Sequence, residues 1–200
     1  MVEPILRNRA TFMDPGTAKV LFERLSPFLQ FVHYHDQTSS STSHLLGPKI
    51  PSGAYIPVAV NEFMRISKYA PQGQFRQHFD TGYVRDKSSA GFWTLLLYLN
   101  EEFVGGETVL YDKKQQRQMG SEVLRVQPKV GQVFAFYHYQ RHAGLKVASG
   151  DAKICLRTEI MFSLQERKNW ELRCEVVESV CRFNMICILL VVSPEYQSPL

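Results

Sequence analysis

The sequence predicts a mainly β fold, a sandwich or a barrel, with one helix near the N-terminus. Short β-type segments follow one another from residue 62 onward, and Gly, Pro and Asp residues separate them. A length of 200 residues fits one domain with a substantial core. The hydrophobic fraction of 44% and the charged fraction of 21% are those of an ordinary globular protein.

A helix is predicted over residues 14–30. Asp14 stands where an N-cap is expected, and Pro15 follows at the first helical position. Apolar residues then recur at helical spacing: Val20, Leu21, Leu25, Phe28 and Leu29. The following residues 36–54 are rich in Ser, Thr, Gly and Pro, which predicts a loop.

Six β-segments are predicted after this loop. They are residues 63–69, 93–100, 107–111, 123–127, 132–139 and 153–163. Residues 93–100 form a continuous apolar run with the length of a buried strand. Many short strands at such spacing are typical of sandwiches and barrels. Residues 83–91 are predicted to be a loop, either a lid over a substrate or a plain surface loop.

The C-terminal segment is predicted to be an appendage of uncertain structure. After Ser163 the chain becomes charged, and then apolar with several cysteines. The apolar run 185–192 is too short to span a bilayer, and we expect it to form a strand or part of a poorly specified tail. We therefore divide the chain into a helix and loop region (1–59), a core (60–163) and the appendage (164–200).

Charge and cysteine content narrow the classes of function. The net charge of +4 fits an anionic small-molecule site or an acidic partner, although a solvated surface with a small excess of Lys is the simpler interpretation. No Lys/Arg cluster is dense enough to predict nucleic-acid binding. The cysteines lack a C-x-x-C pair, which argues against a zinc knuckle. The N-terminal residues lack the apolar stretch of a signal peptide, so we expect a cytoplasmic location with reduced thiols.

The residues His78, Phe79 and Asp80 form a His-x-Asp pattern. On an extended segment, positions i and i+2 point to the same side, so the imidazole and the carboxylate come together. A second histidine from another strand would complete the facial triad of non-haem iron(II) oxygenases, which leaves positions open for a bidentate oxo-acid and for dioxygen. The pattern alone is weak evidence, because an exposed turn with His and Asp often produces it.

Four sequence blocks in a fixed order give this pattern its context. They are YAPQGQFRQHFD (69–80), WTLLLYLNEEFVGGET (93–108), VQPKVGQVFAF (126–136) and HAGLKVASGDAKICLRTEIMF (142–162). Together they resemble the catalytic domain of prolyl 4-hydroxylase-like 2-oxoglutarate/Fe(II)-dependent dioxygenases. The resemblance covers roughly residues 60–163 and implies a double-stranded β-helix, a jelly-roll of two packed antiparallel sheets.

The resemblance also implies an activity and its cofactors. The expected reaction is the oxidative decarboxylation of 2-oxoglutarate to succinate, coupled to hydroxylation of a C–H bond. Fe(II), 2-oxoglutarate and O2 would take part, and L-ascorbate would keep the iron reduced. A peptidyl proline is the candidate substrate, and a protein, peptide or small molecule of another kind stays open because fold does not fix substrate.

The iron ligands follow from the resemblance by position. His78 and Asp80 match the first two ligands, and His142 matches the distal one because x-Gly follows it. His138 lies four residues earlier, where some family members also have a histidine. We interpret His138 as an exposed or hydrogen-bonded residue at a strand end.

The distal carboxylate of 2-oxoglutarate needs a buried cation, for which the sequence offers two candidates. Lys153 lies about where the family places a Lys or Arg after the distal ligand, and we favour it over Arg157. Arg157 is four residues later, on the same face of the predicted strand. One of the two must instead be an ion-pair partner, for example of Glu159 or Glu107.

Two tyrosines and three glycines also match the family. Tyr69 and Tyr98 match tyrosines whose hydroxyls commonly reach the co-substrate, although structural roles are equally compatible with buried tyrosines. Gly105 and Gly106 match a turn into the next strand, and Gly131 follows Pro128 in another turn; we expect them to serve backbone geometry.

Some positions depart from the family pattern, and two other classes of protein stay open. Glu159 and Phe162 replace an Asp and a Tyr, and Ala143 stands where acidic residues are common. A catalytically impaired jelly-roll that binds a metal or a partner, as a truncated or aberrant product, would have the same fold. A cupin-type protein would use more histidines at another spacing, without a cation after the distal ligand.

Overall fold

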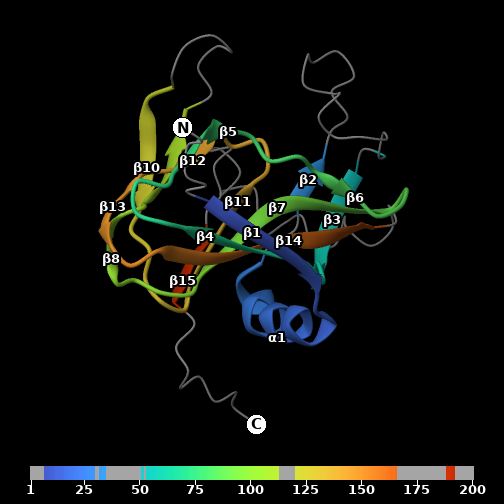
Figure 1. The fold of residues 1–200 in the computed structure, drawn as a ribbon. Coiled ribbons are helices and arrows are strands. Elements are labelled where there is room, and N and C mark those ends of the chain that lie inside the picture. Colours follow the sequence, from blue (N-terminus) through green and yellow to red (C-terminus); the bar gives the residue numbers. More distant parts are fainter. Residues whose placement is uncertain are drawn as a thin grey trace.

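The computed structural model describes residues 7–29, 32–34, 51, 53–112, 120–165 and 188–191, with the backbone alone for 32–34 and 188–191. Strands dominate it, and they form antiparallel sheets. One α-helix lies beside the largest sheet (Figure 1).

Eight strands form the core in two antiparallel sheets. In the main sheet the order is β4 (Phe63–Tyr69), β14 (Lys153–Leu164), β7 (Ser89–Tyr98) and β11 (Gln132–Tyr137). In the second sheet the order is β10 (Glu122–Val126), β9 (Thr108–Tyr111), β12 (His142–Gly144) and β5 (Phe75–His78). The chain crosses repeatedly from one sheet to the other, which is the connectivity of a jelly-roll. The predicted double-stranded β-helix is therefore confirmed.

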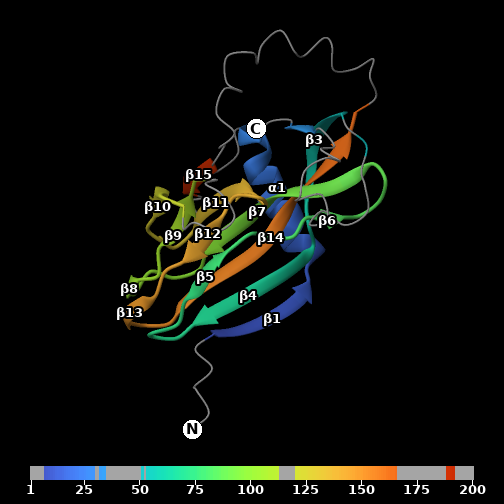
Figure 2. The same ribbon diagram turned by 90° about the horizontal axis from the view of Figure 1, so that it is seen from above.

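Further strands widen the main sheet. β1 (Arg7–Met13) pairs with β4 and lies at one edge (Figure 2), and β15 (Ile188–Val191) pairs with β11 at the other. β3 (Gly53–Val60) pairs with β14, β2 (Val32–Tyr34) with β3, and β6 (Tyr83–Val84) with β7. β8 (Phe103–Gly105) and β13 (Val147–Gly150) form a separate pair.

The predicted helix is confirmed at its start and is shorter at its end. The helix α1 (Pro15–Leu25) begins after Asp14, whose side chain accepts a hydrogen bond from the Thr17 amide at 2.9 Å. A 3-10 turn, Ser26–Phe28, replaces the last predicted turn. Ala18, Leu21 and Leu25 are the buried helix residues, whereas Val20 and Phe28, predicted on the apolar face, are exposed.

Two apolar clusters lie on opposite faces of the main sheet. One joins the buried face of α1 to Trp93 and Leu95 of β7. The other lies between the two sheets and contains Tyr98 of β7, Leu110 of β9 and Phe134 of β11. Alternate residues of β7 therefore enter different clusters, and this explains why its sequence is apolar on both faces apart from Ser89 and Thr94.

All six predicted β-segments form strands, with ends shifted by a few residues. The short strands β8, β12 and β13 were missed because so few residues carry little periodicity. The longer strand β1 was missed as well. The predicted loop at residues 83–91 is wrong at both ends: Tyr83 pairs with Gly91 and Val84 with Ala90 in a β-hairpin, and residues 85–88 connect its two strands. An ion pair of 3.0 Å between Arg85 and Glu62 connects this hairpin to the residues between β3 and β4.

Most of the predicted loop 36–54 and of the appendage 164–200 lies outside the described residues. Residues 53–54 begin β3, and β15 confirms a strand within the apolar run 185–192. The division at residue 59 stays a prediction, and β1 and β3 pair directly with strands of the core. No helix in the described part of the chain has the length and apolar character to cross a membrane.

Candidate metal centre and pocket

The three predicted metal ligands meet at one end of the second sheet. His78 is the last residue of β5, Asp80 follows two residues later, and His142 begins β12. His142 and His78 are direct partners in the antiparallel pairing of these strands. The Asp80 amide donates to the His138 carbonyl oxygen at 3.0 Å, which fixes the chain just after β5. The two strands therefore bring together residues 64 positions apart.

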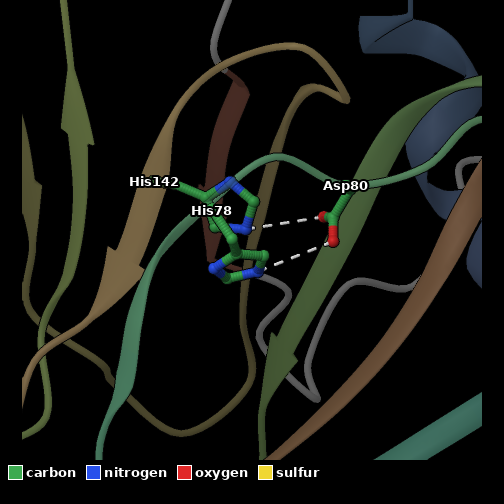
Figure 3. A group of neighbouring side chains, drawn as sticks. All are labelled: His78, Asp80 and His142. Carbon is green, nitrogen blue, oxygen red and sulfur yellow. Dashed lines mark ion pairs between the residues drawn. The ribbon is translucent and has the colours of Figure 1, made fainter. Parts of the chain in front are cut away.

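Both imidazoles point toward the Asp80 carboxylate (Figure 3). His142 Nε2 lies 3.5 Å from Asp80 Oδ2, and His78 Nε2 lies 3.7 Å from Asp80 Oδ1. One ligand atom from each residue lies within 4.8 Å of the others, a spacing that allows all three to hold one metal ion. This cluster of two histidines and one carboxylate has the composition of the facial triad.

The hydrogen bonds of the two histidines fit metal binding. His78 Nδ1 is 2.7 Å from the Arg76 carbonyl oxygen, and His142 Nδ1 is 2.9 Å from the Gln140 carbonyl oxygen. A carbonyl only accepts, so each neutral ring carries its proton on Nδ1 and has a free lone pair on Nε2. Those Nε2 atoms are the ones that face Asp80. Metal-bound histidines are commonly oriented by such a bond from the second nitrogen.

Burial keeps His142 in the uncharged form that a metal requires. Burial lowers the pKa of His142 to about 4, while the Asp80 carboxylate opposes this shift. The ring is therefore neutral near pH 7, and binding of a cation there displaces no proton from it. His78 is more open, with about a fifth of its side chain exposed (21%), so it lies on the solvent side of the cluster.

Two residues from the main sheet orient the Asp80 carboxylate. Thr94 Oγ1 of β7 donates to Asp80 Oδ2 at 2.5 Å. Arg157 of β14 donates to both carboxylate oxygens, from Nη2 at 3.0 Å and from Nε at 3.3 Å. Arg157 also lies 3.8 Å from Glu159, one of the partners considered from the sequence. Arg157 is therefore engaged as an ion-pair partner of two carboxylates.

A pocket of about 590 Å³ opens beside the three ligands. Its wall includes Lys153 and Arg157 on β14, which confirms that both point to the same side of that strand. Lys153 is buried, and its Nζ donates to the Gly106 carbonyl oxygen at 2.6 Å. Burial lowers its pKa from the ordinary value of 10.5. No carboxylate forms an ion pair with Lys153 among the described residues, in contrast to Arg157.

The two tyrosines differ in their relation to the pocket. Tyr69 lines it, and burial raises the pKa of its hydroxyl to about 12. Tyr98 is fully buried and does not line it; its hydroxyl donates to Thr108 Oγ1 at 2.8 Å, and Thr108 does line the pocket. Lys153 Nζ lies above both rings, 5.2 Å from the centre of Tyr98 and 5.8 Å from that of Tyr69.

The interpretation of His138 as exposed or hydrogen-bonded is wrong. His138 is buried, and neither ring nitrogen has a hydrogen-bond partner within the described part of the chain. Burial lowers the pKa of its ring, so it is packed as a neutral group. It is not one of the three residues whose ligand atoms converge. Its sequence position, four residues before His142, gave no sign of this burial.

The turn glycines have the backbone geometry expected of them. Gly105, Gly106 and Gly131 have φ values of 82°, 69° and 76°, a region that favours glycine. A Cβ on Gly106 would lie 3.2 Å from Lys153 Cδ, so this glycine leaves room for the buried lysine whose ammonium group its carbonyl accepts.

Several pocket residues escaped the sequence analysis. Thr94 looked like part of an apolar strand, although its place one residue after Trp93 puts it on the inward face of β7. Arg7 and Arg9 of β1 line the pocket wall from a segment that was not predicted to be a strand. Their alternation with Asn8 and Ala10 was the one available signal.

Comparison with known proteins finds one family model that matches part of the chain. Residues 64–158 match the family model described as the 2OG-Fe(II) oxygenase superfamily. This match confirms the resemblance that the motifs indicated, and the matched residues contain His78, Asp80 and His142. The comparison with curated proteins finds no match.

Similar solved structures include two prolyl hydroxylases and a cupin. A Pseudomonas putida prolyl-4-hydroxylase is 20% identical, with a TM-score of 0.44 over 82% of this chain and 75% of that one. A Trichoplax adhaerens prolyl hydroxylase, in complex with a hypoxia inducible factor peptide fragment, is 16% identical, with a TM-score of 0.43 over 82% and 66%. A Bordetella pertussis cupin domain is 18% identical, with a TM-score of 0.32 over 57% and 98%. At these values the likenesses leave the substrate of this chain open.

Proposed function

We propose that this protein is an Fe(II)- and 2-oxoglutarate-dependent dioxygenase that hydroxylates a C–H bond, with a peptidyl proline as the first substrate class to test. The observation that carries the proposal is the convergence of two imidazole Nε2 atoms and one carboxylate beside a pocket whose buried Lys153 has no carboxylate partner among the described residues. His78, Asp80 and His142 would hold the iron. Iron with bound 2-oxoglutarate supplies the oxidative chemistry, and O2 is the oxidant.

Lys153 is the residue proposed to bind the distal carboxylate of 2-oxoglutarate. It is buried in the pocket wall without a carboxylate partner among the described residues, so an incoming carboxylate would restore a favourable environment to its charge. Arg157 is less suited to this role because Asp80 and Glu159 already neutralise it. Arg157 would instead hold Asp80 in place, together with Thr94.

The tyrosines take supporting roles in the proposal. Tyr69 would offer its hydroxyl to the co-substrate from the pocket wall. Tyr98 would act through Thr108, whose hydroxyl group accepts its hydrogen bond. The pocket is partly apolar, with Phe75 and Leu96 in its wall, and this limits the access of water. L-ascorbate would support turnover by keeping the iron reduced.

Anaerobic titration with Fe(II) and 2-oxoglutarate tests the metal centre. The wild-type protein should develop the weak visible charge-transfer band of the chelate. His78→Ala and His142→Ala should abolish it, because each removes one of three ligands. His138→Gln is the matched control, since His138 is the neighbouring histidine whose ring does not join the cluster. A band that survives His78→Ala would contradict the assignment of the ligands.

Succinate formation then tests catalysis. Production of succinate from 2-oxoglutarate should require Fe(II) and should rise with proline-containing peptides if the substrate class is right. Binding of both ligands without succinate under any condition would favour the catalytically impaired jelly-roll. Stimulation by ascorbate is expected, and its absence would remove that cofactor alone.

A further inference from the structure

One wall of the pocket is a regular array of side chains from three neighbouring strands. The pairing of β1 with β4, and of β4 with β14, aligns their residues in rows across the sheet. The pocket-lining rows are Arg7–Tyr69–Lys153, Arg9–Ser67–Cys155 and Thr11–Arg65–Arg157. Every strand contributes alternate residues, as a pleated sheet requires for one face. The wall therefore carries five basic side chains.

Two of these five cations are neutralised by the protein itself. Arg157 is held by Asp80 at 3.0 Å and lies 3.8 Å from Glu159. Arg65 lies 3.6 Å from the same Glu159, which is buried. These two arginines thus share the charges of two carboxylates. Glu107, near Lys153, lies 3.9 Å from Arg125, a cation outside the pocket wall.

The expected co-substrate does not neutralise the other three cations, which are Arg7, Arg9 and Lys153. The charge of Fe(II) cancels that of the two carboxylates of 2-oxoglutarate, one of which we assign to Lys153. The wall would then keep a positive excess even with iron and 2-oxoglutarate bound. Such an excess beside a partly apolar pocket favours an anionic ligand.

Arg7 and Arg9 are the cations placed to meet that ligand. Both come from β1, at the edge of the main sheet, which is separated from β14 by β4. Tyr69 lies between Arg7 and Lys153 in the first row, so one carboxylate does not serve both positions. The Arg7 guanidinium lies over the Phe75 ring, 4.1 Å from its centre, which holds it toward the pocket. Arg9 is exposed, and no carboxylate of the described residues pairs with it.

We propose that the substrate of this site is an anion, and that Arg7 and Arg9 bind its carboxylate at the mouth of the pocket while the carbon to be oxidised lies beside His78 and Asp80. This inference rests on the proposed oxygenase function and names its substrate class. Arginine suits the role because its planar guanidinium meets a carboxylate with two parallel hydrogen bonds. The carboxylate comes from an acidic peptide side chain or from a free acid.

Calorimetric titration of the complete chain tests the proposal without turnover. The protein is loaded with Mn(II) and saturating 2-oxoglutarate, so that the position at Lys153 is filled. Three probes are compared: a short peptide with a central proline and flanking glutamates, the same peptide with glutamines, and free glutamate. The glutamate peptide should bind about 10-fold more tightly than the glutamine peptide, and the difference should shrink as salt is added, because Arg9 is exposed.

Substitutions on β1 and β4 distinguish binding by Arg9 from a general attraction of the peptide to the positive charge of the protein. Arg9→Ala should remove most of the preference for the glutamate peptide, and Arg9→Glu should reverse it. Lys68→Ala is the matched control: Lys68 is an exposed cation on β4 that is not in the pocket wall, so its loss should leave the preference intact. Arg9 is an exposed surface residue, and circular dichroism checks that the variants keep their fold.

The outcomes distinguish this inference from the function on which it rests. Equal affinity for both peptides and no Arg9-dependent binding of glutamate, in a protein that binds Mn(II) and 2-oxoglutarate, would overturn the anionic substrate and leave the oxygenase function standing. Arg9-dependent binding of the glutamate peptide supports a peptide source, and Arg9-dependent binding of glutamate alone supports a free acid. An Arg9-dependent preference in a protein that fails to bind 2-oxoglutarate would contradict the proposed function alone.

Discussion

At the scale of single residues, Lys153 is the residue at which the stability of the folded chain and the binding of a ligand make opposite demands. It is buried within the pocket wall, its ammonium group meets one carbonyl and two aromatic rings, and burial lowers its pKa. A charge held in this way destabilises the folded chain until a ligand carboxylate arrives. Functional sites commonly keep such groups because binding uses their unmet interactions.

The first prediction concerns the pH dependence of stability at Lys153. Its pKa is lower in the folded chain than the ordinary 10.5, so the unfolded chain binds more protons between these two values. The free energy of unfolding of the wild type should therefore rise with pH across this window, more steeply than that of Lys153→Met. Urea unfolding at about pH 7 and about pH 10 measures the two slopes.

The same variant should lose affinity for 2-oxoglutarate by roughly 10- to 100-fold, because it loses a charge-assisted hydrogen bond worth ~1.5–3 kcal/mol. Lys146→Met is the control, since Lys146 is exposed and does not line the pocket. For the pH prediction, equal slopes of the free energy of unfolding against pH in wild type and Lys153→Met would show that the lysine titrates normally.

At the scale of elements, the site depends on which face of each strand a residue occupies. Alternate residues of β7 enter the cluster against α1 and the cluster between the sheets, and Thr94 is on the inward side with Tyr98. The outward neighbours Trp93 and Leu95 hold the strand against the helix side. β7 thus fixes Asp80 through one face because its other face is anchored in the core.

The second prediction compares two buried threonines of neighbouring strands. Thr94→Val keeps the shape of the side chain and removes the hydrogen bond to Asp80, so metal affinity should fall about 10- to 100-fold. Thr158→Val of β14 removes hydrogen bonds to the carbonyls of Asn61 and Phe63, away from the ligands. It should cost about 1–3 kcal/mol of stability and leave metal affinity unchanged.

Anaerobic metal titration and urea unfolding measure both effects of the threonine substitutions. Equal metal affinity in Thr94→Val and wild type would mean that Arg157 alone is sufficient to orient Asp80.

At the scale of the whole molecule, the candidate metal site joins distant parts of the chain. His78 and His142 come from two strands of the second sheet, and Arg157 and Thr94 from two strands of the main sheet. A bound metal and co-substrate would therefore connect both sheets of the jelly-roll. Ligands that bind only the folded chain stabilise it by mass action.

The third prediction is a thermal shift on loading. Mn(II) and 2-oxoglutarate, each at about 100 times its Kd, should add roughly 2.7 kcal/mol per ligand. A domain of this size gains about 2–4 °C in Tm per kcal/mol, so each ligand should raise Tm by roughly 5–10 °C. Scanning calorimetry of wild type and His78→Ala measures it, and the variant should lose the shift from both ligands. A shift of the same size in His78→Ala would place the metal elsewhere.

The sequence by itself determined the core strands and the start of the helix, and it singled out His78 and Asp80 as candidate ligands. These features are local: the apolar run within residues 93–100, the cap at Asp14 and the spacing of His78 and Asp80 each involve a few consecutive residues. The family resemblance joined the blocks in order and added His142, and residues 64–158 match the family model.

Only the tertiary structure decided what each of these residues faces. The register of β5 with β12 sets His142 opposite His78. The packing of the main sheet against the second sheet brings Arg157 of β14 to Asp80, 77 positions away. The tertiary structure also buries His138, and it adds β1 with Arg7 and Arg9 to the pocket wall. The physical reason is that the period of a strand fixes which residues share a face, whereas its neighbour in the sheet depends on contacts between distant segments.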